Sequence, residues 1–177
     1  MEDVLKLAQD IGFTNSCALD VATLAFLPEV REMCSVNTCG AYGKNWSCPP
    51  ACGTLEECRA RTGRYSTGVI VQTTSQLDDP FDYEGMAALQ KKHQGLFVRF
   101  AQALRADARD ILPLGAGPCL NCESCTYPQE PCRAPDTMFS PMEGYGIFVS
   151  DLCAKNGIRY YYGANTLTYV SMVLFAG

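Results

Sequence analysis

The chain has 177 residues, 47% of them hydrophobic, which is enough for one folded domain over residues 1–177 with a buried core. Its net charge of −5 argues against nucleic acids and anionic membranes as partners, and no apolar run is long enough to cross a bilayer. The acidic start at residues 1–6 lacks the apolar stretch of a signal peptide, so we expect a cytoplasmic protein.

The first half of the chain predicts helices and strands around one irregular segment. Residues 1–11 have the spacing of an amphipathic helix, and the apolar run 17–26 predicts a strand. Thr54 and Glu57 form a capping box that starts a helix after the irregular segment. The β-branched run 68–74 then predicts a central strand.

The second half begins with the longest predicted helix, residues 84–107, whose apolar stripe includes His93, and continues into a short strand over 110–114. We expect His93 to be a core residue. Ser140 and Glu143 read as a second capping box, starting a helix that ends at Asn156-Gly157. Residues 158–162 and 167–175 predict a hairpin. The expected fold is an α+β sandwich, with helices on a mixed or antiparallel sheet that carries two irregular cysteine-rich loops.

Cysteine usage is the unusual feature of the composition. Eleven cysteines accompany a single histidine, His93. In a reducing compartment closely spaced cysteines bind metal more often than they form disulfides. Because so few imidazoles are present, the site must be nearly all thiolate, which suits iron–sulfur clusters or four-thiolate zinc.

The second cysteine segment gives the stronger of the two metal signals. Cys119, Cys122, Cys125 and Cys132 follow one another at spacings x2, x2 and x6. The C-x2-C-x2-C spacing turns three thiols towards one point, as in iron–sulfur sites, and the longer last loop can return the fourth ligand. We expect these four residues to bind a [4Fe–4S] cluster.

The first cysteine segment, residues 34–58, offers five thiols in a stretch rich in glycine and proline. We expect Cys34, Cys39, Cys48 and Cys58 to bind a second cluster and Cys52 to be spare. Cys58 ranks above Cys52 because it falls in the first turn of the helix capped by Thr54, where a thiolate is favoured. The protein would then hold one or two clusters. Zinc stays open as the alternative for either segment.

The two segments also resemble the motifs of a known family. Cys39 through Pro50, followed by Glu57 and Cys58, is similar to the first signature of an uncharacterised, cysteine-rich family of predicted metal-binding proteins (domain of unknown function 2284). The stretch from Cys119 to Pro135 is similar to its second signature, with Ser140 to Glu143 following. The resemblance implies metal binding at both segments and supplies no reaction.

Three functions are consistent with these residues. The first is electron transfer within or to a larger redox enzyme, with a redox partner protein that meets the acidic surface. The second is an enzyme in which a cluster with an open iron binds a small substrate, with Lys44, Arg133, Glu143 and Tyr145 as nearby polar groups. The third is a structural or sensing zinc protein. Tyr42 and Trp46 could shield a cluster from water or simply pack against the sheet.

Overall fold

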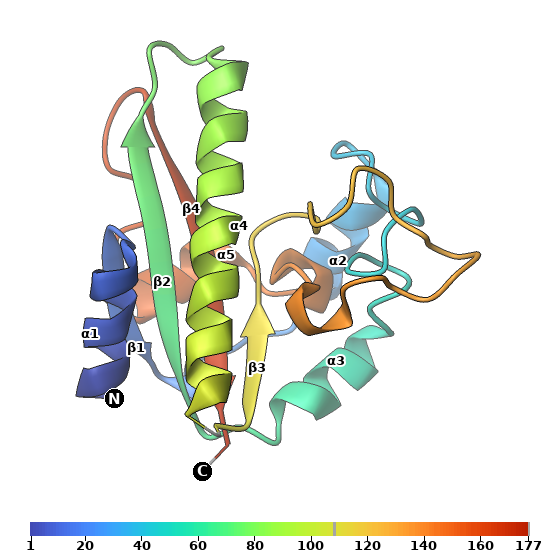
Figure 1. Cartoon of the computed structure of the whole chain (residues 1–177), viewed down its shortest axis with the longest axis horizontal. Helices are drawn as coiled ribbons and strands as arrows, with labels where there is room; N and C mark the ends of the chain where they lie inside the picture. Colours follow the sequence, from blue (N-terminus) through green and yellow to red (C-terminus); the bar gives the residue numbers. More distant parts are fainter. Residues whose placement is uncertain (108, 177) are drawn as a thin grey trace.

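The central sheet is built around two long strands. The computed structural model describes residues 1–107 and 109–176. In it, β2 (Thr67–Gln76) pairs with β4 (Thr166–Phe175) along their whole lengths, from Thr67 opposite Phe175 to Gln76 opposite Thr166. The shorter β1 (Asn15–Leu19) and β3 (Ile111–Leu114) complete the order β1-β2-β4-β3, and every pairing is antiparallel (Figure 1). The predicted α+β fold is confirmed, with an antiparallel sheet.

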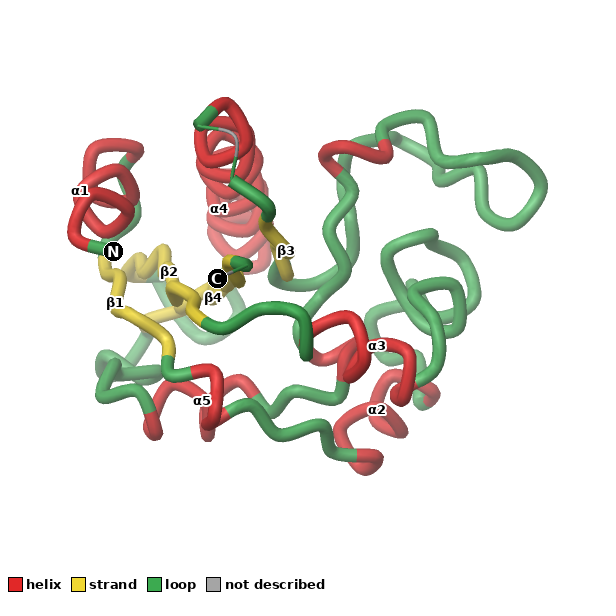
Figure 2. Tube along the Cα trace, turned by 90° about the horizontal axis from the view of Figure 1, so that it is seen from below, coloured by secondary structure: helices red, strands yellow, loops and turns green. Residues whose placement is uncertain are grey.

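Helices cover both faces of this sheet. On one face α1 (Glu2–Ile11) and α4 (Tyr83–Ala106) pack against Val69, Val71 and Val173. On the other face α5 (Val149–Lys155) and the segment before it cover Ile70, Met172 and Leu174, as Figure 2 shows. Because both faces are covered, β2 is buried without interruption from residue 68 to residue 73.

Two further helices lie to one side of the sheet, beside the long loops (Figures 1 and 2). The sequence analysis did not predict α2 (Pro28–Ser35), which begins with proline at its first turn and runs into the first cysteine segment. It did predict α3 (Leu55–Thr62): Glu57 N donates to Thr54 Oγ1 at 3.2 Å, and Thr54 N donates to Glu57 Oε2 at 2.7 Å. The Thr54 capping box is therefore confirmed.

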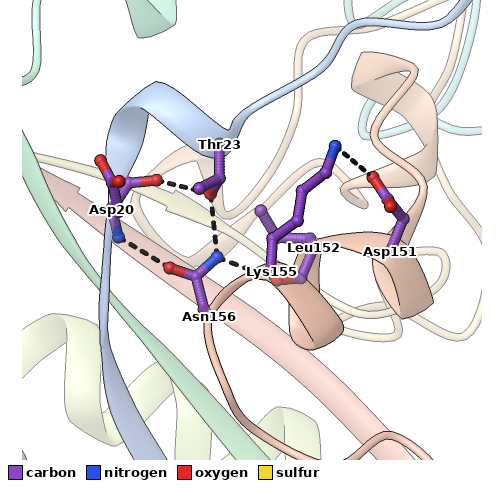
Figure 3. Close-up of polar contacts among 6 residues, drawn as sticks. All are labelled: Asp20, Thr23, Asp151, Leu152, Lys155 and Asn156. Carbon is purple, nitrogen blue, oxygen red and sulfur yellow. Dashed lines mark hydrogen bonds and ion pairs between the residues drawn. The ribbon is translucent and has the colours of Figure 1, made fainter.

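A polar junction joins α5 to the turn that follows β1. The predicted strand 17–26 ends early, at Leu19, and gives way to a 3-10 turn, η1 (Val21–Thr23). Asn156 accepts from Asp20 N at 2.8 Å and donates to Thr23 Oγ1 at 2.9 Å and to Leu152 O at 2.9 Å (Figure 3). Lys155 and Asp151 form an ion pair at 2.7 Å on the same helix. These bonds fix α5 beneath the sheet.

The helix predicted to start at Ser140 begins later, at Val149, although its predicted end at Asn156 is confirmed. Residues 140–142 run alongside the end of β3: Gly115 N donates to Ser140 O at 2.8 Å, and Met142 N donates to Gly115 O at 3.1 Å. Only a 3-10 turn, η3 (Glu143–Tyr145), follows, and α5 starts at Val149. Gly146 ends η3 with a φ of 74°, where its backbone meets Leu27 too closely for a side chain. These tertiary contacts outweigh the local helix signal.

The predicted hairpin of residues 158–162 and 167–175 is also wrong, because 158–162 forms no strand. Both edges of β4 are already occupied, by β2 and by β3. The 158–162 segment instead contacts the buried side chain of Gln72: Gln72 Nε2 donates to Arg159 O at 2.7 Å, and Tyr162 Oη donates to Gln72 Oε1 at 2.7 Å.

His93 occupies the core position that the sequence predicts. It is fully buried on α4, and its two ring nitrogens lie 2.8 Å from Thr73 Oγ1 and 2.8 Å from Ser171 Oγ. Burial lowers the pKa of His93 to about 3, so the ring is neutral at ordinary pH. Both nitrogens are occupied by the sheet, which leaves none for a metal.

Candidate metal centre

The second cysteine segment arranges its four thiols around one cavity. Cys119, Cys122, Cys125 and Cys132 all line a space of about 340 Å³, together with Cys39 of the first segment. The four thiols of the second segment are half-buried, and Cys39 is exposed. The cavity is therefore rich in soft sulfur ligands and open enough to receive a metal group.

The charges around this cavity suit an anionic metal–thiolate group. Burial raises the pKa of the Cys119 thiol; the backbone amide of Asn121 lowers it, and negative charge on Cys132, Cys122 and Cys125 raises it further. The neighbouring cysteines thus oppose the ionisation of Cys119, a cost that a bound cation removes. Lys44 and Arg133, two of the polar residues that the sequence analysis singled out, also line this cavity.

Direct hydrogen bonds join the two cysteine segments. Asn45 Nδ2 donates to Cys119 O at 3.2 Å, and Cys119 N donates to Ser47 Oγ at 3.1 Å. Trp46 donates to Glu130 O at 3.0 Å, and its ring meets Tyr127 edge to face at 4.9 Å. Trp46 lines the thiol cavity as well, so its indole ring lies between that cavity and the second segment's Tyr127 and Glu130 contacts.

The first segment brings three of its four predicted ligands together. Cys34, Cys39 and Cys48 line a second cavity of about 510 Å³, along with Tyr42. Burial raises the pKa of Cys48 to about 11, opposed by a hydrogen bond with Ser47 at 3.5 Å and reinforced by negative charge on Cys39, Cys34 and Cys119. Cys39 lines both cavities, which are therefore adjacent.

Cys58, the fourth predicted ligand, lies apart from these three and beside Cys52. Both thiols are buried, and Cys58 Sγ lies 3.7 Å from Cys52 O. The guanidinium groups of Arg31 and Arg61 approach Cys58 Sγ to 3.9 Å and 3.7 Å. A hydrogen bond with Cys52 and these two cations lower the pKa of Cys58 to about 7, although burial opposes them. The same hydrogen bond and burial raise the pKa of Cys52.

Sequence reasoning missed the two arginines that hold this pair in place. Arg31 also donates to Gly144 O and Gly53 O, and Arg61 donates to Cys52 O and, at 2.7 Å, to Tyr145 Oη. The low pKa of Cys58 comes from these tertiary contacts, whereas the sequence suggested only the start of α3. The signal that could have pointed to Arg61 is its place one turn after Cys58.

The remaining candidate residues lie in different parts of the molecule. Glu143 lines the 510 Å³ cavity, whereas Tyr145 is buried, and burial raises its pKa to about 12 against the nearby Arg61 charge. Cys17 and Cys153 pack with the core. All eleven cysteines are free thiols. Among the described residues, no three His, Cys, Asp or Glu side chains are grouped tightly enough to hold a single metal ion.

Comparison with known proteins gives one match. No helix in the described part of the chain has both the length and the apolarity needed to cross a membrane. No curated protein and no solved structure matches the chain. A family model described as a predicted metal-binding protein (DUF2284) matches residues 17–175, which include both cysteine segments. The chain belongs to this DUF2284 family of predicted metal-binding proteins.

Proposed function

We propose that this protein is an iron–sulfur protein that binds a [4Fe–4S] cluster through Cys119, Cys122, Cys125 and Cys132 and acts in electron transfer. The observation that carries the proposal is the gathering of five thiols around one cavity, four of them from a single loop. The only histidine is held in the core by Thr73 and Ser171, so the site offers no imidazole, and its soft donors are the thiols. Such a donor set is typical of iron–sulfur clusters.

A bound cluster supplies reversible one-electron transfer, and the surrounding residues tune it. Lys44 and Arg133 line the cavity and offset the negative charge of the thiolates. Trp46 and Tyr127 pack together beside it and limit the access of water. The acidic chain, with a net charge of −5, would meet a redox partner that presents a basic surface.

We propose Cys34, Cys39, Cys48 and Cys58 as the ligands of a second cluster. The shared 510 Å³ cavity supports the first three. Cys58 has weaker support as the fourth ligand, because it lies beside Cys52. A cluster with three thiolates and a fourth position that faces this cavity would favour the enzyme function, since an open iron can bind a substrate.

Metal analysis of protein prepared under strict anaerobiosis tests the proposal. We expect brown protein with iron and acid-labile sulfide in equal amounts, and a paramagnetic signal after reduction with dithionite. Cys153→Ser is the control, because this buried thiol lies in the core and lines neither cavity. Colourless protein that contains zinc and no sulfide would instead identify a structural or sensing zinc protein.

A further inference from the structure

The cavity beside the first cysteine segment has the size of a small-molecule site. Its volume of about 510 Å³ falls within the roughly 300–1,000 Å³ typical of ligand pockets. Residues of α2, of α5, of the first cysteine segment and of the turn just before the second segment line it, including Val30, Val149 and Pro118. The wall is therefore largely apolar, as expected of a pocket that holds an organic molecule.

Exposed apolar side chains gather at this cavity. Met33, Phe148 and Tyr160 are 67%, 51% and 45% exposed, and all three line it. They come from α2, from the residue before α5 and from the loop that follows α5. Large apolar side chains cost free energy when they face water, so their convergence on one concavity points to an occupant that covers them.

Glu143 places one negative charge in this apolar wall. It is the only carboxylate among the lining residues, which include no lysine, arginine or histidine. The Glu143 side chain is exposed to water at the wall of this cavity. Burial is the main cause that raises the pKa of Cys34 and of Tyr160, and the negative charge of Glu143 is the second cause for both. None of the ion pairs formed within residues 1–107 and 109–176 includes Glu143.

A carboxylate that shares an apolar cavity with aromatic residues is an arrangement that recognises organic ammonium ions. The negative charge of Glu143 attracts a cation, and the aromatic residues Tyr42, Tyr160 and Phe148, which line the same cavity, offer rings for a cation–π contact. An anionic ligand would be repelled. We propose that this cavity binds a small organic ammonium ion, with its charged nitrogen at Glu143 and its apolar body along the cavity wall.

The bound molecule would lie next to Cys34, Cys39 and Cys48, which line the same cavity. The site is thus positioned to bring an amine to whatever these thiols hold. The inference does not require iron, because it depends on the shape and charge of the wall and not on the identity of the metal.

Three probes with one hydrocarbon chain and different head groups test this inference: hexylammonium, 1-hexanol and hexanoate. Calorimetric titration of the intact protein at pH 7 should give the tightest binding for hexylammonium and none for hexanoate. Glu143→Gln should weaken hexylammonium binding about 10- to 100-fold and leave 1-hexanol unchanged. Glu32→Gln is the matched control, because this exposed carboxylate lies on α2 outside the lining.

A second variant tests the cavity without altering its charge. Ser150 lines the wall, so Ser150→Phe should abolish binding of both hexylammonium and 1-hexanol. Equal affinity of Glu143→Gln and the unmutated protein for hexylammonium would overturn the inference. So would a dimer dispersed by Phe148→Ser together with no probe binding, since the apolar rim would then be a protein interface.

Iron and sulfide are measured in the same samples, so this inference and the iron–sulfur proposal can fail separately. Probe binding by protein that lacks iron would support the ammonium site and overturn the cluster proposal. Iron-loaded protein that binds none of the probes would do the reverse.

Discussion

The two cysteine segments place their thiols in different ways. The second segment delivers four thiols to one cavity within a short loop, whereas the first spreads five thiols over two environments. Close spacing keeps the thiols of one loop in the same region of the molecule. Longer spacing lets helices intervene: α2 carries Cys34, and α3 carries Cys58 to a buried place beneath two arginines.

The largest expected effect comes from removing one ligand of the compact segment. We expect Cys122→Ser to lose about half of the iron and sulfide if two clusters are bound, and to remain folded because Cys122 is outside the core. Quantitative iron and sulfide analysis and circular dichroism measure the two effects. Loss of all iron together with soluble protein would mean that both segments share one site.

The second largest effect is expected at His93, which should matter for the stability of the sheet and not for metal binding. His93→Leu should keep its metal but lower the free energy of unfolding by about 1–3 kcal/mol for each hydroxyl left unpaired, at Thr73 and Ser171. Urea unfolding and metal analysis test the two parts. A fall in metal content would show that His93 serves the site.

His93 also predicts a dependence on pH. Its folded pKa of about 3 lies below the usual 6.5, so the unfolded chain takes up a proton first as the pH falls. This group therefore favours folding fully above pH 6.5, and that contribution falls by about 1.4 kcal/mol per pH unit between pH 6.5 and pH 3. In His93→Leu the acid slope should be shallower by this amount. An unchanged slope would contradict the buried, neutral ring.

A smaller effect is expected at the start of α3. Thr54→Ala removes the cap of the helix that carries Cys58 and should cost about 1 kcal/mol of unfolding free energy. Metal at the second segment should not change, because α3 does not line that cavity. Parallel loss of iron from both segments in metal analysis would show that they depend on each other more closely than their separate cavities suggest.

The smallest effect concerns the bond between the two segments. Trp46→Phe removes the donor to Glu130 O but keeps an aromatic ring against Tyr127, so the expected loss is about 0.5–1.5 kcal/mol. The second segment should release iron to a chelator faster than in the unmutated protein. Identical release rates would mean that Trp46 does not restrain the loop.

Local signals predicted much of the fold. The capping box at Thr54, the stripe on α4 and the β-branched core of β2 each depend on neighbours in the chain, and the structure has all three. The predicted helix start at Ser140 was wrong because pairing with Gly115 and the contact of Gly146 with Leu27 override its capping residues. The predicted hairpin of residues 158–162 and 167–175 was wrong for a similar reason, because β4 pairs with distant strands.

In the candidate site, too, local sequence predicted some features and missed those that depend on distant contacts. The close spacing of Cys119, Cys122, Cys125 and Cys132 predicted that they would share one region, and all four line the same cavity. The contacts of Arg31 and Arg61 with Cys58 join α2 and α3, and no local pattern contains them. The cavity around Glu143 is likewise assembled from segments far apart in the chain, so only the folded molecule reveals it.

Cys39 has one further consequence. It is exposed and belongs to the walls of both cavities, so it is the sulfur that the two regions have in common. Oxidation or alkylation of this one sulfur atom would alter both cavities at once. The two cavities are therefore sensitive to chemical damage at one and the same position.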